Sequence, residues 1–237
     1  MSASDVDLWR IDLAAAASDI AQFRLGLTAK ERMQADTFVS PELRARYTID
    51  RASLRAILAT YLGMPSDAVI IKKGPTGKPY VDAALQFNHS HSEDLAVCAI
   101  AWRSEVGVDI ERLREFHDMN GVAGIFFTPE ERNNVATALE RERVLAFFRC
   151  WTRKEALLKA TGIGIASAVE DPAAPEAWDT YELTPAPSYV GAVVVTHGTI
   201  VCESWNEVRS YPDLLDVIRS QSELRRNETI SGSLRPQ

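Results

Sequence analysis

Cysteines, long apolar runs and clustered basic charge are scarce in this sequence. Its three cysteines, Cys98, Cys150 and Cys202, stand far apart, and an odd number without short spacings fits neither a disulfide framework nor a zinc site. No apolar run approaches the roughly 18 residues that a membrane span needs, and the N-terminus lacks the pattern of a secretory signal. A formal net charge of -7 without a compensating basic block argues against nucleic-acid binding. We therefore expect a cytoplasmic protein with no membrane or nucleic-acid partner.

The residues that are present give the composition of an ordinary globular protein. Of the 237 residues, 46% are hydrophobic and 25% are charged. This length allows one large domain or two small ones and a substantial core. From about residue 221 the chain is polar, and we predict a flexible tail over residues 221–237.

Capping signals and hydrophobic periodicity predict an α+β fold. Thr28, three residues before Glu31, predicts a capping box at a helix start. A Ser40 cap followed by proline predicts a second, longer helix that stops at Gly63. The short connection 103–105 predicts a hairpin between the strands on either side of it. The other predicted elements are strands over 6–13, 69–73, 95–102, 106–110, 178–183, 189–196 and 199–205, and helices from 128 and over 144–161. Each half runs from helix to strand, which predicts two similar α+β lobes.

Two short segments hold the candidate catalytic residues. Glu155 and Lys159 are four apart on a predicted helix, so their side chains share one face. Asp109 and Glu111 are two apart on a predicted strand, so their carboxylates point the same way. Each pair alone has a simpler explanation. The two strand acids could lie on the solvent face of the strand, and the helix pair could be an ordinary surface ion pair. Together, three carboxylates and a lysine can form a site for a hard divalent cation and a phosphorylated substrate.

Two further segments suggest ligand contacts. Lys78 lies in a predicted turn, where a lysine is usually solvated but could also contact a phosphate. His89 and His91 invite a zinc interpretation, but no third soft ligand lies at a suitable spacing. We favour a loop over residues 87–92 that presents Ser90 and His91 to a nucleotide.

Taken in order, these motifs resemble those of the Sfp-type 4′-phosphopantetheinyl transferases. The aspartate–glutamate pair together with the Trp-x-x-Lys-Glu-x-x-x-Lys segment is highly specific for that family, and the outer motifs support it. The matching blocks are Gly-Lys-Pro at 77–79, Phe-Asn-His-Ser-His-Ser at 87–92, Gly-Val-Asp-Ile-Glu at 107–111, Phe-Phe-Thr-Pro-Glu-Glu at 126–131 and Trp-Thr-Arg-Lys-Glu-Ala-Leu-Leu-Lys at 151–159.

The resemblance implies a fold and an activity. The fold would be a pseudo-two-fold monomer of two α+β lobes, residues 1–105 and 106–220, with the active site and coenzyme A in the cleft between them. The reaction would transfer 4′-phosphopantetheine from coenzyme A to a serine of an apo acyl or peptidyl carrier protein, releasing 3′,5′-ADP. A chain of this length resembles the broad-range class, which favours carriers of secondary metabolism.

The resemblance also implies roles for individual residues. Asp109, Glu111 and Glu155 would hold Mg²⁺, and Lys159 would contact the phosphates. Glu155 is also the best candidate for taking the serine proton, although a metal-bound water stays an alternative. Two positions depart from the family pattern, Leu43 and His89. The residues implied for the nucleotide end are Lys78, Ser90 and His91, with Arg46 and Arg51 at the 3′-phosphate.

The chemistry agrees with this interpretation, because phosphoryl-type transfer asks a protein mainly to position groups and to neutralise charge. Two rival hypotheses are a Mg²⁺-dependent hydrolase of nucleotide pyrophosphates and a non-catalytic module that binds a carrier protein or coenzyme A. We also expect the carrier protein to dock on residues 161–168, where Ile163 and Ile165 follow the catalytic helix; the alternative is that both isoleucines fill the core.

Overall fold

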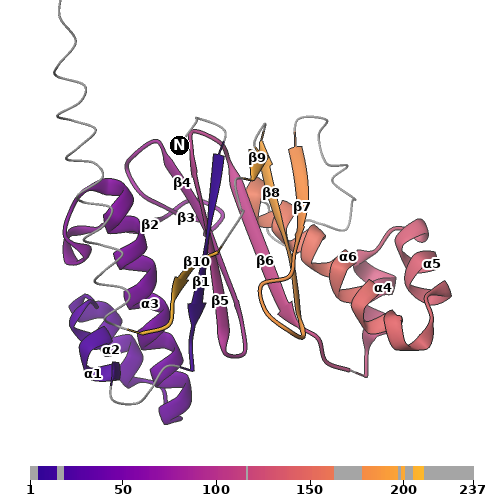
Figure 1. Cartoon of the computed structure of the whole chain (residues 1–237), viewed down its shortest axis with the longest axis horizontal. Coiled ribbons are helices and arrows are strands. Elements are labelled where there is room, and N and C mark those ends of the chain that lie inside the picture. The colour runs from indigo at the N-terminus through magenta and orange to yellow at the C-terminus, as the bar shows by residue number, and fades with distance from the viewer. Residues whose placement is uncertain are drawn as a thin grey trace, which may run out of the picture. The chain divides into compact units, whose positions relative to one another are not determined.

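The computed structural model describes residues 5–14, 19–115, 117–162, 178–196, 199–200 and 205–210. Helices and strands are both abundant (Figure 1), which confirms the α+β class. The chain divides into two compact units, residues 1–10 with 71–206 and residues 11–70 with 207–237. The predicted pair of similar lobes, with a boundary after residue 105, stays a prediction. Among the described residues no helix combines the length and apolarity needed to cross a membrane.

The first unit holds most of the β-structure. One sheet has the strand order β10–β1–β5–β4, with β9 in parallel beside β1, and a second has the order β6–β8–β7. The short strands β2 and β3 form a separate antiparallel pair. The strands are β1 (Asp5–Asp12), β2 (Lys72–Lys73), β3 (Pro79–Tyr80), β4 (Leu85–Ser92), β5 (Leu95–Trp102), β6 (Val106–Arg112), β7 (Trp178–Leu183), β8 (Tyr189–Thr196), β9 (Thr199–Ile200) and β10 (Asn206–Val208).

The predicted hairpin across 103–105 is wrong. Strand β5 pairs along its whole length with β4, whereas β6 pairs with β8 in the other sheet. Arg103 has a φ of +64°, in the left-handed region that turns a chain sharply. The predicted strand over 69–73 is also shortened to β2.

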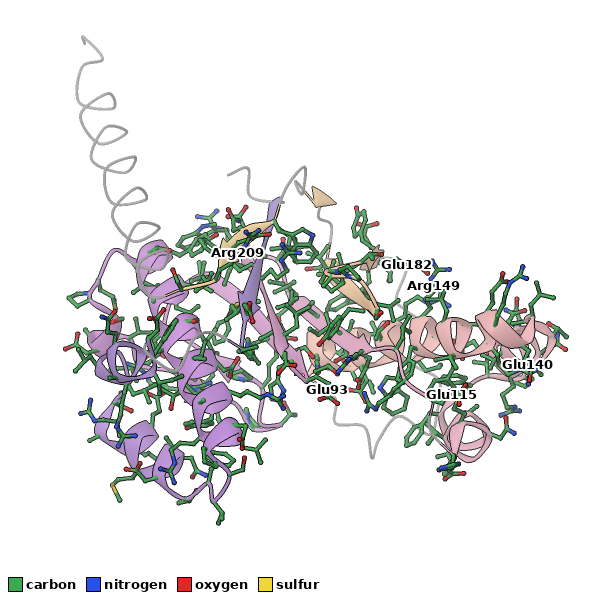
Figure 2. All side chains as sticks on the ribbon, turned by 60° about the horizontal axis from the view of Figure 1, so that its bottom comes forward. Glu93, Glu115, Glu140, Arg149, Glu182 and Arg209 are labelled. Carbon is green, nitrogen blue, oxygen red and sulfur yellow. The ribbon has the colours of Figure 1, made fainter. Side chains whose placement is uncertain are left out.

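Helix α6 (Glu140–Thr161) packs on the sheet of β6, β8 and β7 (Figure 1). Its Ala156 and Ala160 share a buried cluster with residues of β8. A Cβ atom on Gly107 of β6 would lie 2.1 Å from the carbonyl oxygen of Ala156, so only glycine allows this close approach. Arg149 of α6 and Glu182 of β7 point toward each other (Figure 2) and form a salt bridge of 3.3 Å.

Two short helices pack on the first half of α6. They are α4 (Met119–Phe126) and α5 (Pro129–Thr137), and their apolar side chains meet Phe147 and Phe148. Helix α5 follows the predicted start at residue 128, with a capping box between Thr128 and Glu131. This packing fixes the helix that holds Glu155 and Lys159.

The described part of the second unit is helical apart from the end of β1 and most of β10. It contains α1 (Ile20–Leu25), α2 (Ala29–Asp36), α3 (Pro41–Leu62) and the 3₁₀ helix η2 (Ser66–Ala68). Its caps agree with the sequence: Thr28 forms a capping box with Glu31, Ser40 caps α3, and Gly63 ends α3 with a φ of +65°. Arg55 is buried, donates to the carbonyl of Val69 at 2.6 Å and pairs with Glu31.

Candidate active site

Strand β6 and helix α6 bring Asp109 and Lys159 together. The Lys159 ammonium donates to Asp109 Oδ1 at 2.6 Å and to Ser90 Oγ at 3.0 Å. Asp109 is only 5% exposed, so the solvent-face alternative is wrong for this residue. Its second oxygen, Oδ2, is buried and has no hydrogen-bond partner within the described residues. A buried carboxylate oxygen in that condition is a natural ligand for a cation.

The electrostatics of the site point the same way. Burial raises the pKa of Asp109, while the charge and hydrogen bond of Lys159 and the hydrogen bond from Ser90 oppose the rise. Burial also raises the pKa of Glu155, and the neighbouring charge of Asp109 adds to it. The nearby charge of Glu111 raises both pKa values further. The site therefore holds more negative charge than Lys159 alone compensates, and a divalent cation would relieve it.

Glu111 is held from two sides. Its Oε2 accepts a hydrogen bond of 2.8 Å from Ser92 Oγ, and Arg114 Nη1 lies 3.3 Å from the same oxygen. Among the described residues, no three His, Cys, Asp or Glu side chains are gathered closely enough to form a ready metal cage. The charges of the three carboxylates therefore influence one another, although the side chains do not form a complete set of metal ligands in the described part of the chain. These carboxylates are those of Asp109, Glu111 and Glu155.

The segment 87–92 is not the predicted loop, because it forms most of strand β4. Successive residues of β4 point to opposite faces of the strand. The rings of His89 and His91 lie 6.2 Å apart, and the side chain of Ser90, between them in sequence, binds β6. Ser90 donates to Asp109 Oδ1 at 2.8 Å, and His91 is exposed. Ser90 is therefore placed against the acids by a strand, and its nucleotide role, like that of His91, stays a prediction.

A pocket of about 350 Å³ lies beside these groups in the first unit. Lys78 approaches it from the turn before β3, and its ammonium donates to Glu105 Oε2 at 2.6 Å and to the carbonyl of Ala160 at 2.7 Å. Gly162, with a φ of +71°, ends α6 at the same pocket. The lining residues are Thr76, Gly77, Lys78, Pro79, Asn88, His89, Glu155, Leu158, Lys159 and Gly162.

The two predicted arginines belong to the other unit. Arg46 and Arg51 lie on α3, and Arg51 pairs with Glu31 at 3.1 Å. Their contact with a 3′-phosphate stays a prediction. Ile163 and Ile165, predicted for carrier docking, lie outside the described residues, as does the tail over 221–237.

Sequence reasoning missed Ser92 and Asn88, which contact β6 in the same way as Ser90. The signal was present in the sequence, since polar residues at 88, 90 and 92 repeat with the period of two that Asp109 and Glu111 show on their own strand. Glu105, the partner of Lys78, carried no comparable signal.

Comparison with known proteins identifies the family of this chain. A family model described as the 4′-phosphopantetheinyl transferase superfamily matches residues 105–211. The chain is 38% identical over 208 residues to the 4′-phosphopantetheinyl transferase HetI of Nostoc sp. (strain PCC 7120), covering 81% of this chain and 87% of HetI. It is 35% identical over 138 residues to the 4′-phosphopantetheinyl transferase gsp of Aneurinibacillus migulanus, covering 58% of this chain and 57% of that protein. The predicted resemblance is confirmed: this chain belongs to the 4′-phosphopantetheinyl transferase superfamily and is an enzyme of that kind.

Proposed function

We propose that the enzyme transfers 4′-phosphopantetheine from coenzyme A to a serine hydroxyl of an apo acyl or peptidyl carrier protein. The observation that carries the proposal is the convergence of Lys78, Glu155 and Lys159 on one pocket beside Asp109. Two lysine ammonium groups can bind a pyrophosphate-containing donor, and a desolvated carboxylate can take the proton of a serine nucleophile. The family membership supports the same activity.

The proposal includes Mg²⁺ held by Asp109, Glu111 and Glu155. The residues fit this ion, because Asp109 Oδ2 is buried without a partner in the described part of the chain and the pKa values of Asp109 and Glu155 are raised. Mg²⁺ prefers a few carboxylates together with substrate oxygens over a closed protein cage. When bound, the ion supplies positive charge against the pyrophosphate and the departing phosphate.

The protein groups have separate tasks in the reaction. The serine oxygen bonds to the phosphorus that carries the pantetheine arm, and the bond from that phosphorus to the bridging pyrophosphate oxygen breaks. The electron pair leaves with 3′,5′-ADP. The serine proton passes to Glu155, directly or through a water molecule. Lys159 holds the phosphate oxygens, and Lys78 contacts the nucleotide end.

The finer assignments follow the family resemblance. Ser90 and His91 contact the nucleotide, and Arg46 and Arg51 contact the 3′-phosphate. The enzyme acts as a cytoplasmic monomer on carrier proteins of secondary metabolism, which dock on residues 161–168.

A panel of apo carrier proteins tests the proposal. Each is incubated with the enzyme, coenzyme A and Mg²⁺, and mass spectrometry detects the addition of one phosphopantetheine group. We expect modification that EDTA abolishes and excess Mg²⁺ restores. Cleavage of coenzyme A without any carrier would favour a hydrolase, and coenzyme A binding without turnover on any carrier would favour a binding module.

A further inference from the structure

Strands β4 and β6 belong to different sheets, yet a regular series of hydrogen bonds from backbone to side chain, here called rungs, joins them. The backbone N–H groups of β6 donate to polar side chains of β4, which stand two residues apart, and each rung joins residues 20 apart in sequence. The constant offset means that the two strands run in parallel. The rungs are Val108 N–H to Asn88 Oδ1 at 2.9 Å, Ile110 N–H to Ser90 Oγ at 3.4 Å and Arg112 N–H to Ser92 Oγ at 3.1 Å.

The two serines do more than close these rungs. Ser90 donates to Oδ1 of Asp109, and Ser92 donates to Oε2 of Glu111, each at 2.8 Å. Each hydroxyl therefore accepts the N–H of the residue that follows an acid and donates its own proton to that acid. Asn88 has no such second task, because position 107 is glycine.

This double contact fixes one oxygen of each carboxylate and its orientation on β6. For Asp109 the other oxygen is the buried Oδ2 that has no partner among the described residues. For Glu111 both Ser92 and Arg114 bind Oε2, so Oε1 is the oxygen available to a ligand. Carboxylates that bind a metal through one oxygen are commonly oriented through the other, and loss of such a partner typically weakens metal binding by 10- to 100-fold.

We infer that Ser92 is a positioning residue for the metal site: it orients Glu111 so that Oε1 faces the cation. The inference rests on the proposed function, since it presumes a divalent cation at these acids. Ser92 is buried, at 7% exposure, and is absent from the lining of the pocket. The competing interpretation is that Ser92 only closes a backbone rung and stabilises the fold.

The test measures metal binding directly, with Mn²⁺ as the probe and electron paramagnetic resonance as the readout, in the presence of coenzyme A and no carrier. We expect Ser92→Ala to weaken Mn²⁺ binding by about 10-fold or more. Ser92→Thr keeps the hydroxyl and is expected to stay within about 3-fold of the wild type. Ser53→Ala is the control for loss of a buried serine hydroxyl as such, because the Ser53 hydroxyl lies on α3 in the other unit and has no hydrogen-bond partner among the described residues.

Carrier modification provides a second readout. For Ser92→Ala the Mg²⁺ concentration that gives half-maximal rate should rise by the same factor as the Mn²⁺ dissociation constant, with most of kcat recovered at saturating Mg²⁺. If Ser92→Ala fails to fold, Ser92→Cys replaces it, since the thiol keeps the volume but donates only weakly.

The outcomes separate the hypotheses. A lower melting temperature of metal-free Ser92→Ala with unchanged Mn²⁺ affinity would overturn the positioning role and leave the proposed function intact. Equal weakening in Ser53→Ala would overturn it as well. If the wild type bound no Mn²⁺ with coenzyme A present, the metal assignment itself would fail.

Discussion

Helices α3 and α6 each have 22 residues and each end at a glycine with positive φ, +65° at Gly63 and +71° at Gly162. They differ in how their charged side chains are satisfied. On α3, the buried Arg55 donates to two backbone carbonyls and pairs with Glu31, leaving only its Nε without a partner among the described residues, and Arg51 pairs with the same glutamate. On α6, Lys159 neutralises one oxygen of Asp109, while the other oxygen keeps no partner in the described part of the chain.

Two glutamates show the contrast most clearly. Burial would raise the pKa of Glu31, but the hydrogen bonds from Thr28 and the charges of Arg55 and Arg51 outweigh it, so the pKa is lowered. Burial likewise raises the pKa of Glu155, and the charge of Asp109 adds to the effect, so that pKa stays raised. The negative charge of Glu31 is stabilised by its structural partners, whereas the surroundings of Glu155 favour proton uptake or metal binding.

The largest effect should come from Asp109→Asn, which removes the central carboxylate of the proposed metal site. We expect the rate of carrier modification to fall by at least about 10³-fold, because the charge that orders the cation and opposes Lys159 is lost. Modification rates by mass spectrometry and melting temperature by circular dichroism check this. Near-normal turnover in a folded variant would remove Asp109 from the reaction.

Glu155→Gln should have the next largest effect, lowering kcat by about 10²-fold. If Glu155 takes the serine proton, coenzyme A affinity should change by less than about 3-fold, since the loss falls on the transition state. Single-turnover kinetics and calorimetric titration with coenzyme A separate the two quantities. A change confined to coenzyme A affinity would make Glu155 a binding residue.

On α3 the expected effect is on stability. Arg55→Ala should lower the free energy of unfolding by about 2–3 kcal/mol, because it leaves the carbonyls of Asp67 and Val69 without this donor and removes one ion pair of Glu31. Arg44→Ala, at an exposed position of the same helix, should change it by less than about 0.5 kcal/mol. Urea denaturation measures both. Equal losses would show that the burial of Arg55 is not what matters.

The terminal glycines allow a matched comparison of the two helices. Gly63→Ala and Gly162→Ala should each lower the free energy of unfolding by about 1 kcal/mol, because alanine is strained at positive φ. Only at Gly162 would the new Cβ approach pocket residues, lying 3.2 Å from Thr76 Oγ1 and 3.7 Å from Lys78 Cδ. We therefore expect only Gly162→Ala to weaken coenzyme A binding in calorimetric titration, and an equal weakening in both variants would contradict this.

The smallest effect should be a difference in the sign of pH dependence. The lowered pKa of Glu31 gives stability that is present above its unfolded value near 4.5 and is lost as pH falls through the folded pKa. The raised pKa of Glu155 gives stability that is present below 4.5 and is lost as pH rises through the folded pKa. In urea unfolding with EDTA across these pH values, Glu31→Gln should remove a rising component and Glu155→Gln a falling one. Shifts of the same sign in both variants would contradict the comparison.

Local signals in the sequence were sufficient for much of the structure. The caps at Thr28, Ser40 and Thr128 and the stop at Gly63 depend on hydrogen bonds and dihedral angles within a few residues. The placement of Lys159 against Asp109 required only that a helix face meet a strand face. The close packing of the two elements at Gly107 is a finding of the structure.

What failed depended on distant partners. Strand β6 pairs with β8, about 80 residues later in the chain, and no local spacing distinguishes that partner from the nearer β5. The polar residues Asn88, Ser90 and Ser92 favour a loop in the sequence, yet in the structure they are buried on one face of β4. A buried polar face of this kind can be predicted only when the neighbouring strand that hydrogen-bonds to it is known.

The rungs from β4 have a consequence for aggregation. Strand β6 is an outer strand of its sheet, and an outer strand normally offers a row of backbone N–H groups to which another molecule can add a strand. Here side chains already occupy the N–H groups of Val108, Ile110 and Arg112. A side chain cannot extend a ladder as a backbone does, so Ser90 and Ser92, which orient the acids, also close this edge against self-association together with Asn88.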